Sequence, residues 1–318
     1  MDISVVVPLF NEEESLPELT AWIDRVMTAH DFDYEVWLVD DGSTDNSWTI
    51  VEDLSTKNPR LKGIKFQRNY GKSPALFEGF KYAAGDVVIT MDADLQDSPD
   101  EIPDLYKMVK TDGYDMVSGW KQKRHDPIGK TLPSKFFNAV TRMVSGIKLH
   151  DFNCGLKSYR LNVVKSIEVY GDMHRHMPLL AKWAGFKNIG EKVVEHRPRK
   201  YGSSKFGVSR LVTGFLDLLS LMFVGRFGKR PMHLFGTLGT LMFIVGVISV
   251  IYIGGMKLNA LAAGLPAQLV TDNPWFYIAL TTILLGTVLF VTGFLAELVV
   301  RSSADRNHYL VEKVVGNA

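Results

Sequence analysis

The stretch that decides the fold is Val87-Val88-Ile89-Thr90-Met91, which runs directly into Asp92-Ala93-Asp94-Leu95-Gln96-Asp97. Five apolar or β-branched residues in a row predict a buried strand. The carboxylates of Asp92 and Asp94 leave the end of this strand together, and such oxygen ligands suit Mg²⁺ or Mn²⁺ bridging a diphosphate. By itself the motif is a weak signal, because exposed turns and helix caps use the same residues.

Strands and helices alternate on both sides of this stretch. Ile3 to Val7 predicts a strand that Pro8 ends, and Asn11 with Glu14 resembles a capping box at the start of a helix. We expect further strands at 34–39, 61–67 and 87–91, and further helices at about 45–54 and 72–84. This alternation predicts a Rossmann-like α/β fold, with a mostly parallel sheet and helices on both of its faces.

Polar and acidic residues follow three of the predicted strands, and parallel sheets bind their ligands beyond the carboxyl ends of the strands. These residues are Asn11-Glu12, Asp40-Asp41-Gly42-Ser43 and Asp92-Ala93-Asp94. No G-x-G-x-x-G motif follows the first strand and no G-x-x-x-x-G-K-[ST] loop occurs, which argues against a dinucleotide-binding enzyme. We therefore expect a divalent cation, rather than a glycine-rich loop, to bind the phosphates of a nucleotide.

The composition narrows the function further. The 318 residues carry 36 Lys and Arg against 35 Asp and Glu, a net charge of +1, which removes the usual electrostatic reason to expect nucleic-acid binding. Cys154 is the only cysteine, so the sequence predicts no intramolecular disulfide and gives no sign of an oxidising compartment.

Two long apolar segments follow Gly207. Residues 232–256 and 275–296 contain no Asp, Glu, Lys or Arg, and each is long enough to cross a hydrocarbon core. We interpret them as two transmembrane helices within residues 231–300; the alternative is a pair of buried core helices. The loop between them carries only Lys257 and Asp272 as charges, whereas basic residues flank the pair, so the positive-inside rule places both chain ends in the cytoplasm. The flanking residues are Arg226, Lys229, Arg230, Arg301 and Arg306.

A helix at the membrane surface is predicted before the first span. From Ser209 to Gly225 polar residues recur three or four apart, opposite leucine and phenylalanine, which is typical of an interfacial amphipathic helix and also of a helix packed on the soluble domain. No basic stretch with a long apolar run begins the chain, so we expect no cleavable signal peptide. The expected organisation is a cytoplasmic domain at 1–207, a juxtamembrane segment at 208–230, the two spans, and a cytoplasmic tail at 301–318.

Six motifs stand in a fixed order along the chain. They are Val7-Pro8-Leu9-Phe10-Asn11-Glu12, Asp40-Asp41-Gly42-Ser43-Thr44-Asp45, Arg68-Asn69-Tyr70-Gly71-Lys72, Asp92 to Asp97, Asp151 with Gly155, and Arg199 with Gly202-Ser203-Ser204-Lys205. With these motifs the sequence resembles the polyprenyl-phosphate glycosyltransferases of the GT-A fold, family 2, which include dolichyl-phosphate mannose synthases and bacterial undecaprenyl-phosphate sugar transferases. The two C-terminal spans resemble the membrane-anchored bacterial subgroup. Ser98 departs from the family, since many members have proline there.

The resemblance implies a role for each motif. A nucleotide sugar would lie against Pro8, Phe10, Glu12, Asp40, Asp41, Asp92, Ala93, Arg199 and Lys205. The cofactor, Mg²⁺ or Mn²⁺, would be held by Asp92, Asp94 and Gln96. Asp151 and Asp94 would be catalytic, and Lys130 with Ser134 would bind the acceptor phosphate.

Several of these residues also have a structural interpretation. Asp41-Gly42 is a good turn dipeptide, Gln96 suits a loop hydrogen bond, and Lys130 with Ser134 would equally open an amphipathic helix. The basic cluster of Arg197, Arg199, Lys200 and Lys205 suits phosphate binding, but also a solvated face or anionic lipid head groups. Asp151 would orient the acceptor or accept a residual proton, because a phosphate monoester with a second pKa of about 6 is already largely ionised at neutral pH.

The predicted function is an inverting transfer of one sugar from a UDP- or GDP-linked donor to undecaprenyl or dolichyl phosphate. The expected partners are the nucleotide sugar, the polyprenyl phosphate, the membrane and a second copy of the chain in a homo-oligomer. The expected location is the inner cell membrane, with the catalytic domain in the cytoplasm.

Other functions remain open at this level. A transferase that extends a polysaccharide or glycolipid is disfavoured, because no Q-x-x-R-W-like motif occurs and the spans are too few to form a secretion channel. A catalytically inactive membrane scaffold would share the fold but not need the acidic motif. A membrane-anchored nucleotidyltransferase is disfavoured because the chain lacks a glycine-rich loop near its first strand.

Overall fold

The structure is a computed structural model that describes residues 1–122, 138–143, 145–169, 171, 173–198, 200–201, 220, 223, 227, 230–266 and 268–302. The chain forms two compact units, Met1–Leu219 and Ser220–Ala318. Most of the predicted interfacial helix and the tail after Ser302 lie outside the described residues.

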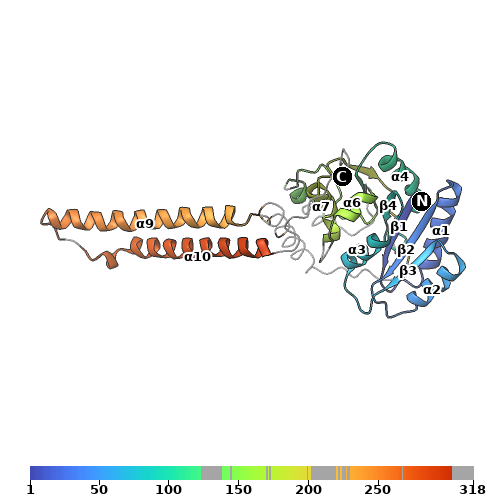
Figure 1. Ribbon diagram of the computed structural model, residues 1–318, viewed down its shortest axis with the longest axis horizontal. Helices are drawn as coiled ribbons and strands as arrows, with labels where there is room; N and C mark the ends of the chain where they lie inside the picture. Colours follow the sequence, from blue (N-terminus) through green and yellow to red (C-terminus); the bar gives the residue numbers. More distant parts are fainter. Residues whose placement is uncertain are drawn as a thin grey trace, which may run out of the picture. The chain divides into compact units, whose positions relative to one another are not determined.

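A seven-stranded sheet runs through the described part of the first unit, with the strand order β3-β2-β1-β4-β6-β5-β7 (Figure 1). Neighbouring strands are parallel except at β6, which is antiparallel to both β4 and β5. The predicted mostly parallel sheet is confirmed. The strands are β1 (Ile3–Leu9), β2 (Tyr34–Asp40), β3 (Leu61–Lys65), β4 (Val87–Thr90), β5 (Met116–Trp120), β6 (Lys157–Arg160) and β7 (Ile189–Val193).

Helices cover both faces of the sheet, as the alternating pattern predicts. Successive residues of a strand face opposite sides, so Val5 and Val7 of β1 join one apolar core and Val6 joins the other. The first core includes residues of α1 (Leu16–Ala29), α2 (Ser47–Lys57) and α4 (Ile102–Lys110), and the second includes residues of α3 (Lys72–Tyr82), α6 (Leu161–Ser166) and α7 (Met177–Trp183). Short 3-10 turns are η1 (Pro99–Glu101), η2 (Met173–Arg175) and η3 (Val270–Asp272).

Two predicted details around the first strand are wrong. Pro8 does not end β1, because the strand continues to Leu9 and Pro8 is the register partner of Val39 on β2. Proline has no backbone N–H, but strand β4 pairs with β1 only as far as Val6. The proline at position 8 therefore removes no hydrogen bond between β1 and β4. Asn11 does not cap α1, which begins at Leu16; its Oδ1 accepts the N–H of Thr44 at 2.8 Å instead.

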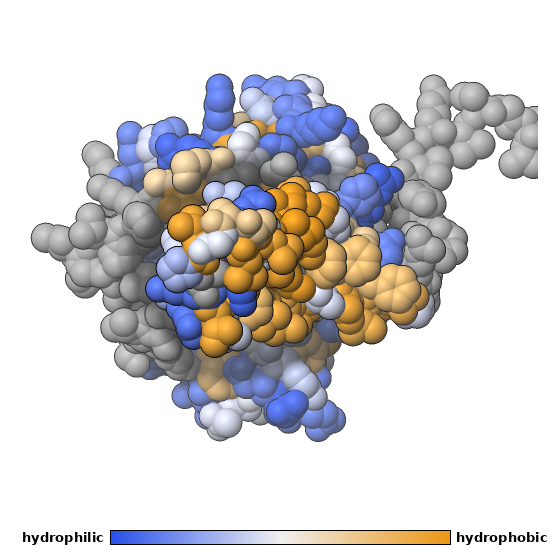
Figure 2. Space-filling view, turned by 90° about the vertical axis from the view of Figure 1, so that its left-hand side faces the viewer, coloured by the Kyte–Doolittle hydropathy of each residue, from blue (hydrophilic) through white to orange (hydrophobic). Residues whose placement is uncertain are grey.

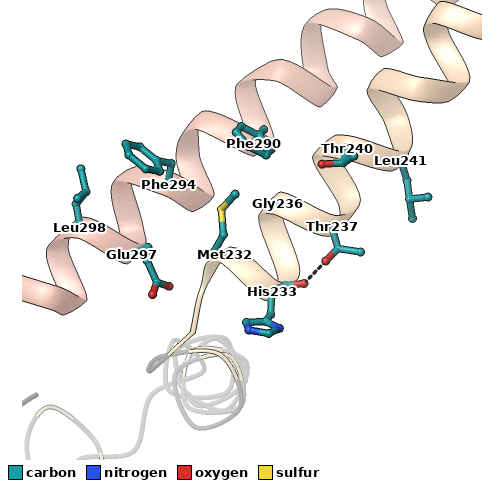
Figure 3. Close-up of a pocket in the computed structure, with 10 residues that line it drawn as sticks. All are labelled: Met232, His233, Gly236, Thr237, Thr240, Leu241, Phe290, Phe294, Glu297 and Leu298. Atoms are coloured by element: carbon teal, nitrogen blue, oxygen red, sulfur yellow. Dashed lines mark hydrogen bonds between the residues drawn. The ribbon is translucent and has the colours of Figure 1, made fainter. Parts of the chain in front are cut away.

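The described part of the second unit contains two long helices, α9 (Met232–Ala262) and α10 (Pro274–Ser302). Both are long and apolar enough to cross a membrane, which agrees with the two predicted spans. Figure 2 shows many of their side chains as a hydrophobic area on the face toward the viewer. A cavity of about 730 Å³ lies between them, lined mostly by apolar residues together with His233, Thr237, Thr240 and Glu297 (Figure 3).

Glycines let α9 and α10 approach closely. A Cβ atom on Gly239 would lie 2.6 Å from the carbonyl oxygen of Gly286, and one on Gly286 would lie 2.7 Å from that of Gly239. Gly246 and Gly293 are similarly crowded, at 2.6 Å from Ile283 Cγ1 and 2.9 Å from Phe235 Cβ. Small residues of this kind allow membrane helices to gain dispersion contacts that lipid would otherwise make.

We expect Gly286→Val to destabilise the helix pair by about 1–3 kcal/mol, because the new side chain meets backbone atoms that cannot move aside. Gly254→Val is the matched control, since a Cβ on Gly254 of α9 meets nothing within 4 Å. Thermal unfolding in detergent, followed by circular dichroism, measures the difference. An equal loss of stability in both variants would contradict the close approach of the helices.

Candidate active site

The loops that follow β1 and β2 are joined by hydrogen bonds at one edge of the sheet. Asn11, which has a left-handed backbone with φ 57°, donates its N–H to Ser43 Oγ at 2.9 Å. The N–H of Glu12 donates to Ser47 Oγ, also at 2.9 Å. These contacts hold the motif that contains Pro8, Phe10 and Glu12, each half-buried, against the acidic turn after β2.

Asp40 and Asp41 are both buried, and the structure shows what their carboxylates bind. Asp40 Oδ1 accepts the N–H of Ser43 at 2.9 Å. The two oxygens of Asp41 accept the N–H groups of Tyr70 at 2.7 Å and Gly71 at 2.9 Å. Burial raises the pKa of Asp41 above its ordinary value, although these two bonds favour the charged form. Asp41 therefore joins the Arg68 to Lys72 motif to the end of β2, and its predicted contact with a nucleotide stays a prediction.

Gly42 makes this junction sterically feasible. Its φ is +73°, and a Cβ atom there would lie 2.5 Å from the carbonyl carbon of Arg68. Only glycine accommodates both the backbone angle and the approach of the neighbouring loop. The turn interpretation of Asp41-Gly42 is thus part of how the acidic motif is built.

Asp92 leaves the end of β4 into a strongly basic environment. Its carboxylate forms an ion pair with Lys72, the first residue of α3, and its side chain is 33% exposed. Burial alone would raise the pKa of Asp92, but Lys72, Lys121 and Lys157 together lower it to about 2. Gly155 packs so closely that a Cβ atom there would lie 2.5 Å from Asp92 Oδ2. Asp92 is therefore ionised and confined to a narrow set of positions.

The rest of the acidic motif, from Asp94 to Gln96, forms a turn and is hydrogen-bonded to the segment that contains Arg197. Asp94 Oδ1 accepts the N–H of Gln96 at 3.2 Å, and Leu95 between them has φ 58°. The carbonyl oxygen of Gln96 accepts the N–H of Arg197 at 3.0 Å, and its Nε2 donates to the carbonyl oxygen of Arg197 at 3.4 Å. The loop hydrogen bond expected for Gln96 is therefore present, and the acidic motif lies beside the start of the basic cluster.

Two cations near Asp92 were missed by the sequence analysis. Lys121, directly after β5, forms an ion pair with Asp97 at 2.7 Å, and this carboxylate is fully buried. Burial alone would lower the pKa of Lys121, but Asp97 and other acidic neighbours raise it, so the group is charged. Lys157 on β6 is only 3% exposed and donates to the carbonyl oxygen of Cys154; its burial lowers its pKa. The sole sequence signal was the position of Lys121 after an apolar run.

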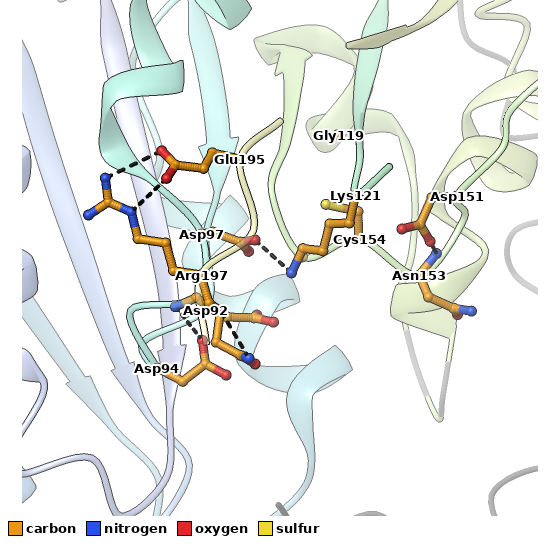
Figure 4. A network of polar contacts seen from close by, with 12 residues as sticks. Asp92, Asp94, Asp97, Gly119, Lys121, Asp151, Asn153, Cys154, Glu195 and Arg197 are labelled. Carbon is orange, nitrogen blue, oxygen red and sulfur yellow. Dashed lines mark hydrogen bonds and ion pairs between the residues drawn. The ribbon is translucent and has the colours of Figure 1, made fainter. Parts of the chain in front are cut away.

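Asp151 lies on the loop that leads into β6. It is 1% exposed, and its Oδ1 accepts the N–H of Asn153 at 3.0 Å. The same loop contains Gly155, which touches Asp92, so the candidate catalytic residue and the acidic motif share one region (Figure 4). Cys154 between them is a buried thiol whose pKa burial raises to about 12, so it is neutral and unsuited to act as a nucleophile.

The described members of the basic cluster bind protein groups. The side chain of Arg197 contacts both oxygens of Glu195, at 3.4 and 3.3 Å (Figure 4). Its guanidinium also covers the ring of Trp22, 4.4 Å from the ring centroid. Lys200 donates to Glu18 of α1 at 2.6 Å. These contacts attach the segment to α1. The predicted phosphate ligands Arg199, Lys205, Lys130 and Ser134 lie outside the described residues.

The residues present fit a divalent cation that is shared with a substrate. Among the described residues, no group of three or more His, Cys, Asp or Glu side chains is arranged to hold a metal ion. Mg²⁺ usually binds one or two protein carboxylates together with substrate phosphates, rather than a complete protein cage. Asp92 and Asp94 supply two carboxylates of this kind, and the nearby lysines suit the phosphate oxygens.

The architecture and the site define a class of protein. A solved structure of glucosyl-3-phosphoglycerate synthase from Mycobacterium tuberculosis in complex with UDP is similar to this chain in fold, with a TM-score of 0.53 and 18% identity over 70% of this chain and 79% of that one. The fold is therefore that of a GT-A glycosyltransferase. The model of the family "Glycosyl transferase family 2" matches residues 4–168, and the chain belongs to this family.

Relatives of known name align along almost the whole chain, including the two apolar helices. Dodecaprenyl-phosphate galacturonate synthase of Rhizobium johnstonii is 33% identical over 95% of this chain and 88% of its own length. Undecaprenyl-phosphate 4-deoxy-4-formamido-L-arabinose transferase of Pseudomonas fluorescens is 32% identical over 99% of this chain and 90% of its own. The family resemblance seen in the motifs is thus confirmed.

We expect Gly155→Ala to abolish most sugar transfer while the protein stays folded, because the added methyl group would lie 2.5 Å from Asp92 Oδ2 and displace this carboxylate from the narrow set of positions it occupies. Gly85→Ala is the contrasting variant: its Cβ would lie 2.5 Å from the backbone nitrogen of Ser4, so it should lower stability instead. Activity assays paired with thermal unfolding separate the two effects. Wild-type activity in Gly155→Ala would show that the position of Asp92 is not critical.

Proposed function

We propose that the chain is an inverting glycosyltransferase that moves a single sugar from a nucleotide diphosphate to a polyprenyl phosphate at the cytoplasmic face of the inner cell membrane. The observation that carries the proposal is the ionised Asp92 among three lysines at the carboxyl edge of the sheet, in a family 2 chain that continues into two long apolar helices. Such a site suits a diphosphate and a second phosphate at once.

The acceptor follows from the relatives. Both relatives described above are named for a polyprenyl phosphate, and this chain matches most of the length of each. The sugars in the two names differ from one another, and about two-thirds of the aligned positions differ between either relative and this chain. The identity of the sugar is therefore not inferred from the relatives. The names of both relatives support a polyprenyl phosphate as the acceptor.

For the donor, we assign Asp92, Asp94 and Gln96 to the cation and diphosphate. A bound Mg²⁺ or Mn²⁺ would supply charge stabilisation to the leaving nucleoside diphosphate. Solved structures of the glucosyl-3-phosphoglycerate synthase, which has the same fold, contain Mn²⁺ and UDP, in keeping with this assignment. Asp40 and Glu12 accept hydrogen bonds from the base and ribose of the nucleotide. Pro8, Phe10, Asp41 and Ala93 complete this surface, and Arg199 with Lys205 bind the phosphates.

The reaction itself is a displacement at the anomeric carbon. A phosphate oxygen of the lipid forms the new bond as the bond to the nucleoside diphosphate breaks, so the configuration inverts. Because this phosphate is largely ionised at neutral pH, strong base catalysis is not required. Asp151 then serves to orient the acceptor or accept a residual proton, and Lys130 with Ser134 hold the acceptor phosphate.

The membrane helices bring enzyme and acceptor together. A lipid phosphate is confined to the bilayer surface, so a catalytic domain tethered to the same bilayer meets it at a high effective concentration. Basic residues flank the pair of apolar stretches, whereas residues 257–274 between these stretches carry only Lys257, near the end of α9, and Asp272 as charges, which supports a cytoplasmic catalytic domain.

The test is to incubate the purified protein in detergent with undecaprenyl phosphate, Mg²⁺ or Mn²⁺, and each of a panel of radiolabelled nucleotide sugars. We expect one donor to yield label that extracts into organic solvent as a lipid bearing a single sugar. Label in a polymer would indicate a chain-extending transferase, and no transfer from any donor would favour an inactive scaffold.

Asp92→Asn should lower metal-dependent transfer by about a hundredfold or more, because the cation loses a charged ligand while the fold keeps its core. Asp86→Asn is the matched control, since Asp86 also pairs with a lysine, Lys110, but precedes β4 instead of following it. The measurements are initial rates with and without a chelator. Full activity of the chelated wild type would refute the metal assignment.

A further inference from the structure

Asp151 is held by two residues that face each other across neighbouring strands. Ser118 on β5 and Glu191 on β7 are register partners in the parallel pair. Ser118 Oγ donates to the carbonyl oxygen of Asp151 at 3.2 Å, and Glu191 Oε1 accepts the N–H of Asp151 at 3.0 Å. Both backbone polar groups of Asp151 are thus bound to side chains of the sheet.

Glu191 also fixes the residue before Asp151. Its Oε1 accepts the backbone N–H of His150 at 2.6 Å, and its Oε2 accepts the ring Nδ1–H of His150 at 2.7 Å. The His150 ring stacks on Trp120, the last residue of β5, with centroids 4.1 Å apart and planes 13° from parallel. Glu191 and Trp120 therefore fix His150 and Asp151 through their backbone N–H groups and through the ring of His150.

This use of Glu191 calls for a reason beyond sheet stability. Its side chain is only 11% exposed, and placing a carboxylate there costs desolvation. Among the residues that the structure describes, its hydrogen-bond donors all belong to His150 and Asp151. Lys192, the next residue, forms ion pairs with Glu101 of η1 and Asp104 of α4, so other contacts also hold the strand.

We propose that Glu191, assisted by Ser118, is the positioning residue that holds Asp151 toward the acceptor phosphate, an inference that rests on the function proposed above. Asp151 lies on an irregular loop, and a loop residue that must meet a reacting group needs support from rigid elements. Glu191 and Ser118 supply that support from two strands, and misplacement of about 1 Å is enough to slow an enzyme a hundredfold.

The experiment compares Glu191→Ala, Glu191→Gln and Asp115→Ala in the full-length protein, each with and without Asp151→Asn. The backbone N–H groups of His150 and Asp151 both donate to Glu191 Oε1. A glutamine side chain retains this oxygen, so Glu191→Gln keeps both hydrogen bonds to the loop. Asp115 is the matched control, because its Oδ2 accepts the N–H of Asn188 at 3.0 Å and so ties the opposite end of the same strand pair. The readouts are kcat, KM for the nucleotide sugar, and the midpoint of thermal unfolding.

We expect Glu191→Ala to lower kcat by about 10- to 100-fold with little change in the donor KM, while Glu191→Gln and Asp115→Ala stay within about threefold of wild type. In the Asp151→Asn background, Glu191→Ala should have an effect of no more than about twofold, because the two residues act as one unit.

Three results would overturn the inference while the wild type remains active. One is an equal effect of Glu191→Ala in both backgrounds, which would mean that it acts independently of Asp151. Another is an equal loss in Glu191→Gln and Glu191→Ala, which would point to its charge instead of its geometry. Unchanged transfer in Asp151→Asn would also remove the inference, whereas absence of lipid product from the wild type would refute the proposed function itself.

Discussion

The charge balance around Asp92 is the interaction on which the site depends. A carboxylate that loses part of its hydration on folding is stabilised where opposite charges offset that loss. Lys72, Lys121 and Lys157 provide those charges, and they come from α3, from the end of β5 and from β6. These elements are distant in the sequence, so the site exists only once the sheet is complete. Folding and the assembly of this charged site are thereby linked.

The sequence was sufficient to predict those helices and strands that a short run of neighbouring residues indicates. Apolar runs ending in acidic turns predicted β1, β2 and β4 to within a few residues, because each strand is buried on both faces. The same edge then had to collect Asp40, Asp41, Asp92 and Asp94, since parallel strands end together. Long uncharged segments likewise indicated α9 and α10, although the helices extend past the apolar limits at which prediction stopped.

What the sequence did not indicate depends on contacts between distant residues. Strand β6, Lys157–Arg160, carries two cations and a serine in four residues and resembles a loop, yet it is an inner strand because β4 and β5 pair with it on either side. The roles of Lys157 and Glu191 follow from that arrangement and have no motif of their own. Asp41 shows the converse: its motif was evident, but only the structure revealed that both oxygens bind the backbone of another loop.

The length and close packing of the helix pair also bear on the lipid environment. The uncharged stretch of α9 from residue 232 to 256 is about 37 Å long at 1.5 Å per residue, whereas a bilayer core is about 30 Å thick. Such hydrophobic mismatch is relieved when a helix leans or when the surrounding leaflet thickens. Because Gly239 and Gly286 join α9 to α10 at backbone distance, the two helices lean as one body. The tilt of the helix pair thus depends on the thickness of the membrane, and lipids of different chain length would change this tilt.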